Sequence, residues 1–295
     1  MNQAKTLDLK KLYKEANLVK IVKKLPIIPI ILLSPMIIFG IFGTMITPHD
    51  PTGFAPSLKL LPPPWAGGEN WSFFLGTDQL GRDVLSRLII GARSSLIASL
   101  CGVALAGVVG VILGMIAGFS KGFADNVIMR IVDIQMAIPP ILLALLLSAV
   151  LHGGLSTIII VIGVAFWAFY ARVIRGETLS IKQRDFIALA RIAGCSQRRI
   201  LLKHIFPNIV STIMVLVTLQ LGQAIMVEAA LTFLGLGLQP PDTAWGLMIA
   251  DGRMYISSAW WIPTFAGLAI MITVLGANLM GDWLRDTLDP KLRQI

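Results

Sequence analysis

The chain has 295 residues, of which 56% are hydrophobic and only 14% are charged, and its mean hydropathy is +0.79. Soluble domains typically carry about 25% charged residues, so this composition excludes an ordinary soluble protein and indicates one whose main solvent is lipid. The net charge of +9 does not indicate nucleic-acid binding, because the basic residues are divided among several polar segments.

Six apolar stretches are long enough to cross a bilayer, which requires about 20 residues. They cover residues 25–46, 90–119, 127–151, 155–175, 209–236 and 260–281. The first follows a basic tail, residues 1–24, with seven lysines. Its length and the lack of an A-x-A site predict an uncleaved span rather than a signal peptide. The predicted fold class is an all-α membrane protein with six transmembrane helices.

The distribution of basic residues predicts the orientation of these spans. With the N-terminus inside, seven basic residues lie in the tail and eight lie between Arg172 and Lys203. The opposite side carries only five, namely Lys59, Arg82, Arg87, Arg93 and Arg253. The positive-inside rule therefore predicts that both termini are cytoplasmic and that residues 284–295 form a cytoplasmic tail.

Residues 47–89 form the longest exterior segment, a proline-rich irregular loop. Residues 81–95 regain helical spacing, which predicts either an interfacial helix ending this loop or the wet first turns of the second span. The loop is longer than a connection requires. We therefore expect it, with residues 231–258, to contact an external partner or to gate the outer mouth.

Two spans carry patterns that predict their packing. Gly110, Gly114, Gly118 and Gly122 are four residues apart, which predicts one small face for close helix packing within the subunit or against a partner. The third span contains Pro139–Pro140, which predicts a kink.

The apolar stretches also contain two acidic residues, Asp133 and Glu228. A charge at mid-bilayer costs about 2.5–3.5 kcal/mol on insertion scales, so each requires a partner, a proton or a wet cavity. For Asp133 an ion pair with Arg130 is the structural alternative to a place on the pathway. Glu228 has no cation among its sequence neighbours, so it and Gln223 are further candidates for the pathway or its gate.

The polar segment 178–208 lies between the fourth and fifth spans, and its pattern predicts two short amphipathic helices parallel to the membrane. The first runs from Ser180 or Lys182 to Ile192, and a left-handed Gly194 ends it. Ser196 caps the second, and the proline at 207 ends it or begins the fifth span. An ordinary basic loop is the simpler alternative, but the pattern favours a docking surface. Its candidate residues are Asp185, Ala188, Ala190, Gly194, Ser196, Arg198, Arg199, Lys203, His204 and Pro207.

The sequence lacks the short motifs that bind nucleotides or metals, since a P-loop, an H-E-x-x-H and a C-x-x-C are all absent. Cys101 lies in an apolar run and Cys195 in the polar segment, which favours neither a disulfide nor a metal site. The histidines, His49, His152 and His204, are far apart. We therefore expect no catalytic residue, no cofactor and no metal in this chain.

At the polar segment the chain resembles a known family. Ala188, Ala190, Gly194 and Pro207 match the spacing of the loop with which permeases of binding-protein-dependent ABC importers touch their ATPases. That loop usually reads E-A-A, then glycine, then L-P, and here Ala188, Leu189 and Phe206 replace its Glu, Ala and Leu.

Three longer stretches resemble the C-type permease subunit of dipeptide, oligopeptide and nickel importers. They are FLGTDQLGRDVLSRLIIGARSSL (74–96), LTFLGLGLQPPDTAWG (231–246) and GLAIMITVLGANLMGDWLRDTLDPKLR (267–293). With them the resemblance covers nearly the whole chain.

The resemblance implies a type I ABC importer permease fold in the bacterial cytoplasmic (inner) membrane, with residues 90–283 as a five-helix core and 178–208 as the ATPase coupling loop. It implies a heterodimer with a B-type permease subunit, an extracytoplasmic solute-binding protein, and two ATPase subunits that bind ATP and Mg. This chain is then a non-catalytic subunit that forms half of the pathway. Peptides are favoured over nickel or a metal chelate, because no row of inward His, Cys or carboxylate side chains suggests a metal relay.

Two other classes of function compete with a permease. A self-sufficient channel or proton-coupled carrier would use Asp133 and Glu228, and it fits the missing nucleotide motif equally well. The basic segment favours the permease, because a channel needs no ATPase dock. An intramembrane enzyme is disfavoured, since no Ser/His, Asp/Asp or metal-ligand set is present.

Overall fold

The computed structural model describes residues 26–120 and 122–288, and within these ranges the chain is helical apart from loops and one isolated bridge. Five helices are long and apolar enough to span a membrane: α2 (Ile27–Ile46), α3 (Val84–Phe119), α6 (Leu155–Lys182), α9 (Phe206–Phe233) and α11 (Trp261–Leu288). They confirm five of the predicted spans. The basic tail 1–24 and residues 289–295 lie outside the described residues.

The third predicted span, 127–151, is not one straight helix. It is divided into α4 (Phe123–Met136) and α5 (Pro140–Leu151), which meet at 89° and together form the sixth candidate span. Pro139 and Pro140 occupy the N-cap and first position of α5. Neither ring nitrogen can donate to the preceding helix, so the kink becomes a break.

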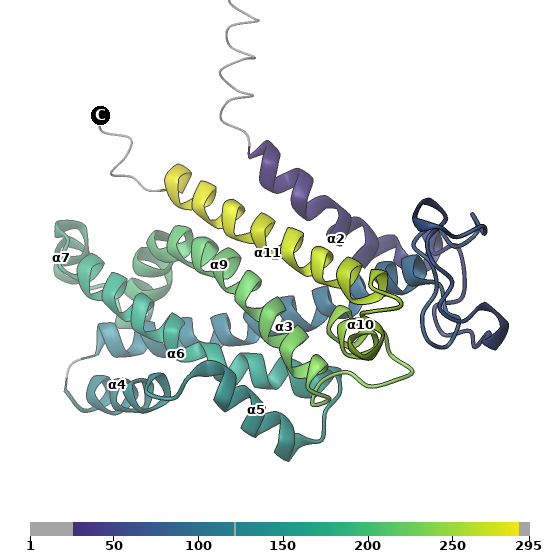
Figure 1. Cartoon of the computed structure of the whole chain (residues 1–295). Coiled ribbons are helices and arrows are strands. Elements are labelled where there is room, and N and C mark those ends of the chain that lie inside the picture. The colour runs from purple at the N-terminus through teal and green to yellow at the C-terminus, as the bar shows by residue number, and fades with distance from the viewer. Residues whose placement is uncertain (1–25, 121, 289–295) are drawn as a thin grey trace, which may run out of the picture.

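Helices α3 and α6 pack against each other along most of their lengths and form the centre of the molecule (Figure 1). Three of the four spaced glycines make this contact possible. A Cβ atom on Gly110 would lie 2.4 Å from the carbonyl oxygen of Trp167, and one on Gly114 would lie 2.6 Å from that of Ala171. The fourth, Gly122, is outside the helix and precedes α4 with a φ of +79°. The small face therefore packs within the subunit.

The remaining helices surround this pair. Helix α9 packs on α3 and α6, while α2 and α11 lie side by side and both contact α3 (Figure 1). Between α9 and α11 is α10 (Trp245–Gly252), which packs on both. The loop 47–83 and α10 lie toward one end of the bundle, and α7 (Asp185–Ile192) lies at the opposite end.

Several helix boundaries differ from the predicted ones. Residues 84–89 are the first turns of α3, so the helical spacing predicted for residues 81–95 belongs to the second span and not to a separate helix. Asp83 starts α3 by accepting a hydrogen bond from the backbone N–H of Ser86, and no breaker interrupts the helix before Phe119. Helix α6 continues to Lys182 and α11 to Leu288, so the predicted segments 178–208 and 284–295 both begin inside helices.

A methyl group added to the α3–α6 contact should destabilise the fold. Gly114→Ala places its Cβ against the Ala171 backbone, and overpacking of this kind costs about 1–3 kcal/mol. We expect a lower melting temperature for the purified subunit in detergent. Gly176→Ala, on α6 with open space around it, is the matched control and should melt at the wild-type temperature or above, because alanine favours helix by up to about 1 kcal/mol. Equal melting temperatures for the two variants would contradict the close contact.

Candidate functional site

The corner after α7 has the conformation that the sequence predicts. Gly194 has a φ of +76° and donates its N–H to the carbonyl of Arg191 at 3.0 Å, while the N–H of Cys195 bonds to the carbonyl of Ala190 at 3.0 Å. These two bonds form a Schellman motif, which ends a helix with a left-handed residue. Nothing lies within 4 Å of a Cβ at Gly194, so backbone conformation rather than space selects glycine here.

The second predicted helix of this segment differs from expectation. Ser196 does cap it, accepting the N–H of Arg199 at 3.4 Å, but α8 (Gln197–Arg199) continues through the π-helical turn η3 (Ile200–Ile205) directly into α9. It is therefore the first part of the fifth span rather than a separate short helix. The wider π-helical turn accommodates Pro207 near the start of α9. In a regular α-helix the proline ring would clash with a backbone carbonyl of the preceding turn, and the π-helical turn changes the backbone geometry there.

The candidate residues of this segment divide between an exposed face and the core. Ala190 is buried and His204 is half-buried. The others are exposed, namely Asp185, Ala188, Gly194, Ser196, Arg198, Arg199, Lys203 and Pro207.

Two exposed apolar residues of α7 were missed by the sequence analysis. Leu189 is 64% exposed and Ile192 is 84% exposed, and both stand beside basic residues at one end of the bundle. Large apolar side chains exposed outside the spans are typical of a protein-contact surface. The sequence does contain a sign of them, because the short helix predicted in the polar segment has apolar residues on more than one face.

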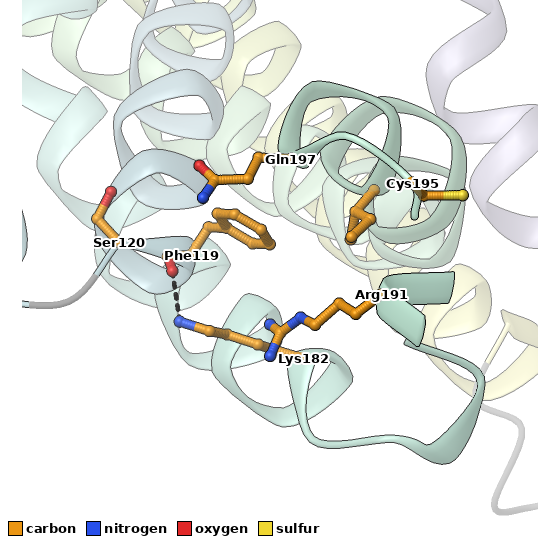
Figure 2. A pocket seen from close by; sticks show the side chains of 7 residues that line it. Phe119, Ser120, Lys182, Arg191, Cys195 and Gln197 are labelled. Carbon is orange, nitrogen blue, oxygen red and sulfur yellow. Dashed lines mark hydrogen bonds between the residues drawn. The ribbon is translucent and has the colours of Figure 1, made fainter. Parts of the chain in front are cut away.

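A pocket of about 700 Å³ lies between the end of α3 and this corner. It is lined by Phe119, Ser120, Lys182, Arg191, Cys195, Gln197 and Ile200, so it joins the end of α3 to the distant segment that runs from the end of α6 to η3. Figure 2 shows Lys182 reaching from α6 to the carbonyl of Phe119, with Arg191 from α7 beside it. The sequence analysis did not predict this pocket.

Lys182 fixes the C-terminal end of α3 within the pocket. Its Nζ donates to the carbonyl oxygens of Phe119 and, at 3.2 Å, of Gly118. The last carbonyls of a helix have no partner within the helix, and a lysine can satisfy them. Such a charged hydrogen bond contributes about 1.5–3 kcal/mol, less where water screens it.

The Phe119 ring lies against both cations of the pocket. Lys182 Nζ is 5.3 Å and Arg191 Cζ is 5.9 Å from the ring centroid. A cation–π contact contributes about 0.5–1 kcal/mol at an exposed site. The end of α3, the end of α6 and the exposed helix α7 are therefore joined around one aromatic ring.

A network of charges holds the opposite end of the molecule together. Asp78, fully buried in the loop, forms ion pairs with Arg82 at 2.6 Å and with Arg87 of α3. Arg87 is only 1% exposed, and it also bonds to Asp251 of α10 at 3.1 Å. Breaking a buried pair on one side costs about 3–5 kcal/mol, so this network fixes the loop and α10 to the start of α3.

Two tryptophans reinforce the same end. The Trp245 indole donates to the carbonyl of Leu88 at 2.9 Å, and Gly91 leaves room for its ring. The Trp261 indole donates to the carbonyl of Thr77 at 3.1 Å. Asp242, in the connection before α10, is exposed, whereas Thr77 is fully buried. Of these two positions, Asp242 is thus the one that is accessible to a partner.

Glu228 is fully buried between α3 and α9 and does not face an open path in this chain. Its two carboxyl oxygens accept hydrogen bonds from Ser95 at 2.9 Å and from Thr232 at 3.0 Å. Two hydroxyl groups therefore satisfy it, and no ion pair to Glu228 is found among the described residues.

The other two pathway candidates are exposed. Asp133 pairs with Arg172 of α6 and not with Arg130, the partner proposed from sequence, because the neighbouring helix brings its guanidinium closer than the turn before. Gln223 is exposed on α9, whereas Glu228 on the same helix is fully buried. The structure thus does not bring Asp133, Gln223 and Glu228 together into one site. No three His, Cys, Asp or Glu side chains could hold a metal ion within the described ranges.

Comparison with known proteins places this geometry in context. Residues 110–294 match the model of a family described as the binding-protein-dependent transport system inner membrane component. The chain is 42% identical to the di/tripeptide transport system permease protein DppC of Pseudomonas aeruginosa, over 89% of this chain and 87% of that protein. It is 38% identical to the probable D,D-dipeptide transport system permease protein DdpC of Escherichia coli, over 88% and 86%.

One solved structure has a similar fold. It is an inward-facing conformation of the MetNI methionine ABC transporter, which matches with a TM-score of 0.57 over 69% of this chain and 97% of that one. Identity to it is 19%, so the likeness concerns the fold alone. It confirms the predicted type I importer permease fold.

Substitution of Glu228 tests whether it is a buried structural acceptor. Glu228→Gln keeps a side-chain oxygen for the hydroxyls of Ser95 and Thr232, so we expect a near wild-type melting temperature and yield. Glu228→Leu leaves both hydroxyls unpaired, at about 1–3 kcal/mol for each buried group, and should lower both. Gln223→Leu, exposed on the same helix, controls for the apolar change. Equal damage from Gln and Leu would instead indicate a cation supplied by another subunit.

Proposed function

Because the chain belongs to the family of binding-protein-dependent transport system inner membrane components, we propose that it is the permease subunit of an ATP-driven importer of di- or oligopeptides. The names of the two relatives described above, a di/tripeptide and a D,D-dipeptide permease, favour peptides over nickel or a metal chelate. The chain forms half of the pathway, and a B-type permease subunit forms the other half.

The observation that carries the proposal is the surface at the end of α7, here called the dock. It comprises Leu189, Ile192 and the Gly194 corner, together with the exposed bases Arg198 and Arg199. This surface lies outside the apolar spans and combines apolar and basic groups, as a protein partner requires. We assign two ATPase subunits as that partner, and they bind ATP and Mg and carry out hydrolysis. This chain itself binds no cofactor and catalyses no reaction.

The opposite end of the bundle then faces the extracytoplasmic solute-binding protein. The loop 47–83 and α10 lie there (Figure 1), held to α3 by the buried charges. Asp242, in the connection before α10, is exposed. ATP binding closes the ATPases and moves the dock, and the bundle rocks to receive peptide from the binding protein. The subunit contributes different contacts in the two states, which is how a ligand shifts a conformational equilibrium.

A self-sufficient channel or proton-coupled carrier is the second candidate function. It would need Asp133 and Glu228 on a common water-filled path. The pairing of Asp133 with Arg172 and the burial of Glu228 under two hydroxyls argue against such a path in this chain. The exposed dock also has no purpose in a channel.

Reconstitution tests the substrate and the energy source together. The complete complex is placed in proteoliposomes with its binding protein outside and the ATPases inside. The vesicles should accumulate labelled dialanine or trialanine only when ATP is enclosed in them. Nickel chloride in place of the peptides should give no uptake above that of empty vesicles. Uptake of nickel but not of peptides would overturn the peptide assignment, and peptide uptake without ATP would overturn the importer assignment.

Gly194→Val tests the dock. A β-carbon at a left-handed position costs about 1–2 kcal/mol, and relief of that strain would turn α7 away from α8. We expect the subunit to remain in the membrane but to lose most co-purified ATPase. Arg198→Ala should do less, because an exposed charge contributes under about 1 kcal/mol. Gly176→Ala serves as the control for a glycine change elsewhere. Assembly and transport of Gly194→Val at the wild-type rate would exclude the dock.

A further inference from the structure

We propose that Phe119, Lys182 and Arg191, here called the Phe119 clamp, are positioning residues that pass the movement of α7 to α3 during transport. The inference rests on the proposed function, because it concerns how movement of the dock reaches the rest of the permease. It assigns a role to side chains that line the pocket and not to the exposed apolar side chains of the dock.

The clamp joins the ends of three helices. Phe119 is the last residue of α3, Lys182 is the last residue of α6, and Arg191 is in the last turn of α7. Lys182 binds the carbonyls at the end of α3, and its Nζ and the Arg191 guanidinium both lie near the Phe119 ring (Figure 2). A displacement of α7 therefore acts on the end of α3 through these side chains.

The packing of α7 explains why such a link is required. This eight-residue helix is joined to α6 only through Gln183 and Arg184, and its buried residues are Ile187 and Ala190. Both pack in the hydrophobic core, whereas the pocket lies between the last turn of α7 and the end of α3. The clamp crosses that pocket, so it is the polar and aromatic connection between the dock and α3.

Helix α3 is suited to carry the movement onward. It runs without interruption from Val84 to Phe119, and its length is packed against α6 through glycines. At its far end Arg87 is bonded to Asp78 in the loop and to Asp251 in α10. The clamp and the charge network thus lie at the two ends of one continuous helix.

The experiment measures coupling in the complete complex, reconstituted with binding protein and dialanine. The readout is the ATP hydrolysis rate with dialanine-loaded binding protein divided by the rate without it. In Lys182→Met and in Phe119→Leu this ratio should fall about fivefold or more, within the usual range for coupling between two sites. ATPase co-purification should stay at the wild-type level, because the dock surface is unchanged.

Two further variants make the test specific. Lys182→Arg keeps a cation and donors for the α3 carbonyls and should keep most of the ratio. Arg130→Met removes an exposed cation from α4, and it should leave the ratio unchanged. If Lys182→Met does not fold, Phe119→Leu with Lys182→Arg still decides the question.

A second readout uses the native thiol of the pocket. Cys195 is half-buried there, and the other cysteine, Cys101, is removed by Cys101→Ser. Without nucleotide, Lys182→Met should increase the rate at which maleimide labels Cys195, because α7 is no longer held against α3. Lys182→Arg should leave that rate near the wild-type value.

The outcomes separate the clamp from the dock. An unchanged hydrolysis ratio in both Lys182→Met and Phe119→Leu, or unchanged labelling of Cys195 in Lys182→Met, overturns the clamp. Loss of the ATPases from Lys182→Met also overturns it, because the lysine would then belong to the dock itself. Retention of the ATPases by Gly194→Val overturns the dock, whatever ratio the clamp variants give.

Discussion

The structure depends on the close approach of α3 and α6. Lipid offers apolar helices no hydrophobic gain on association, so their contact relies on close packing, and glycines allow two backbones to meet. At Gly110 and Gly114 the neighbouring helix comes so near that a single Cβ would collide with its carbonyl oxygens. Every other described element is arranged around this pair. Helix α9 and the α2–α11 layer pack on it, and both candidate functional ends are built on the termini of α3.

The polar groups of this apolar chain are concentrated where helices end. Asp83 begins α3, Lys182 satisfies its last carbonyls, and Asp78 and Arg87 join the loop 47–83 to its first turns. A helix satisfies its own interior backbone in lipid, so only its ends and its junctions require side-chain partners. This explains why the chain has few charged residues and why many of the charged residues that the structure describes have partners.

The sequence was sufficient for features governed by local physics. Long apolar runs predict helices, since only helices or closed barrels satisfy the backbone in lipid, and five of the six runs are continuous helices. The Gly194 corner was also predictable, because the left-handed helix end is a property of a few adjacent residues. The motif stretches 74–96 and 231–246 indicated the family. Their residues contribute to the charge network around Arg87 and to the surroundings of Glu228.

Features that depend on distant residues were not predictable in this way. Prolines 139 and 140 marked where the third span breaks, but the angle of 89° depends on what α4 and α5 pack against. Asp133 was paired within its own helix, whereas the neighbouring helix supplies Arg172. The pocket escaped notice because Phe119 is separated from Lys182 and Arg191 by more than one helix of chain. Pro207 suggested a helix end, yet a π-helical turn carries the helix past it.

The charge network around Arg87 also constrains the order in which contacts form while the protein is made. Arg87 and Asp251 are 164 positions apart in the chain, so the ribosome must add α6, α9 and most of α10 before the guanidinium gains its second carboxylate. Until then Asp78, nine positions away, is the carboxylate of this network within reach of Arg87. This end of the newly made chain is therefore incomplete through most of synthesis. It gains its full set of ion pairs only once α10 is in place.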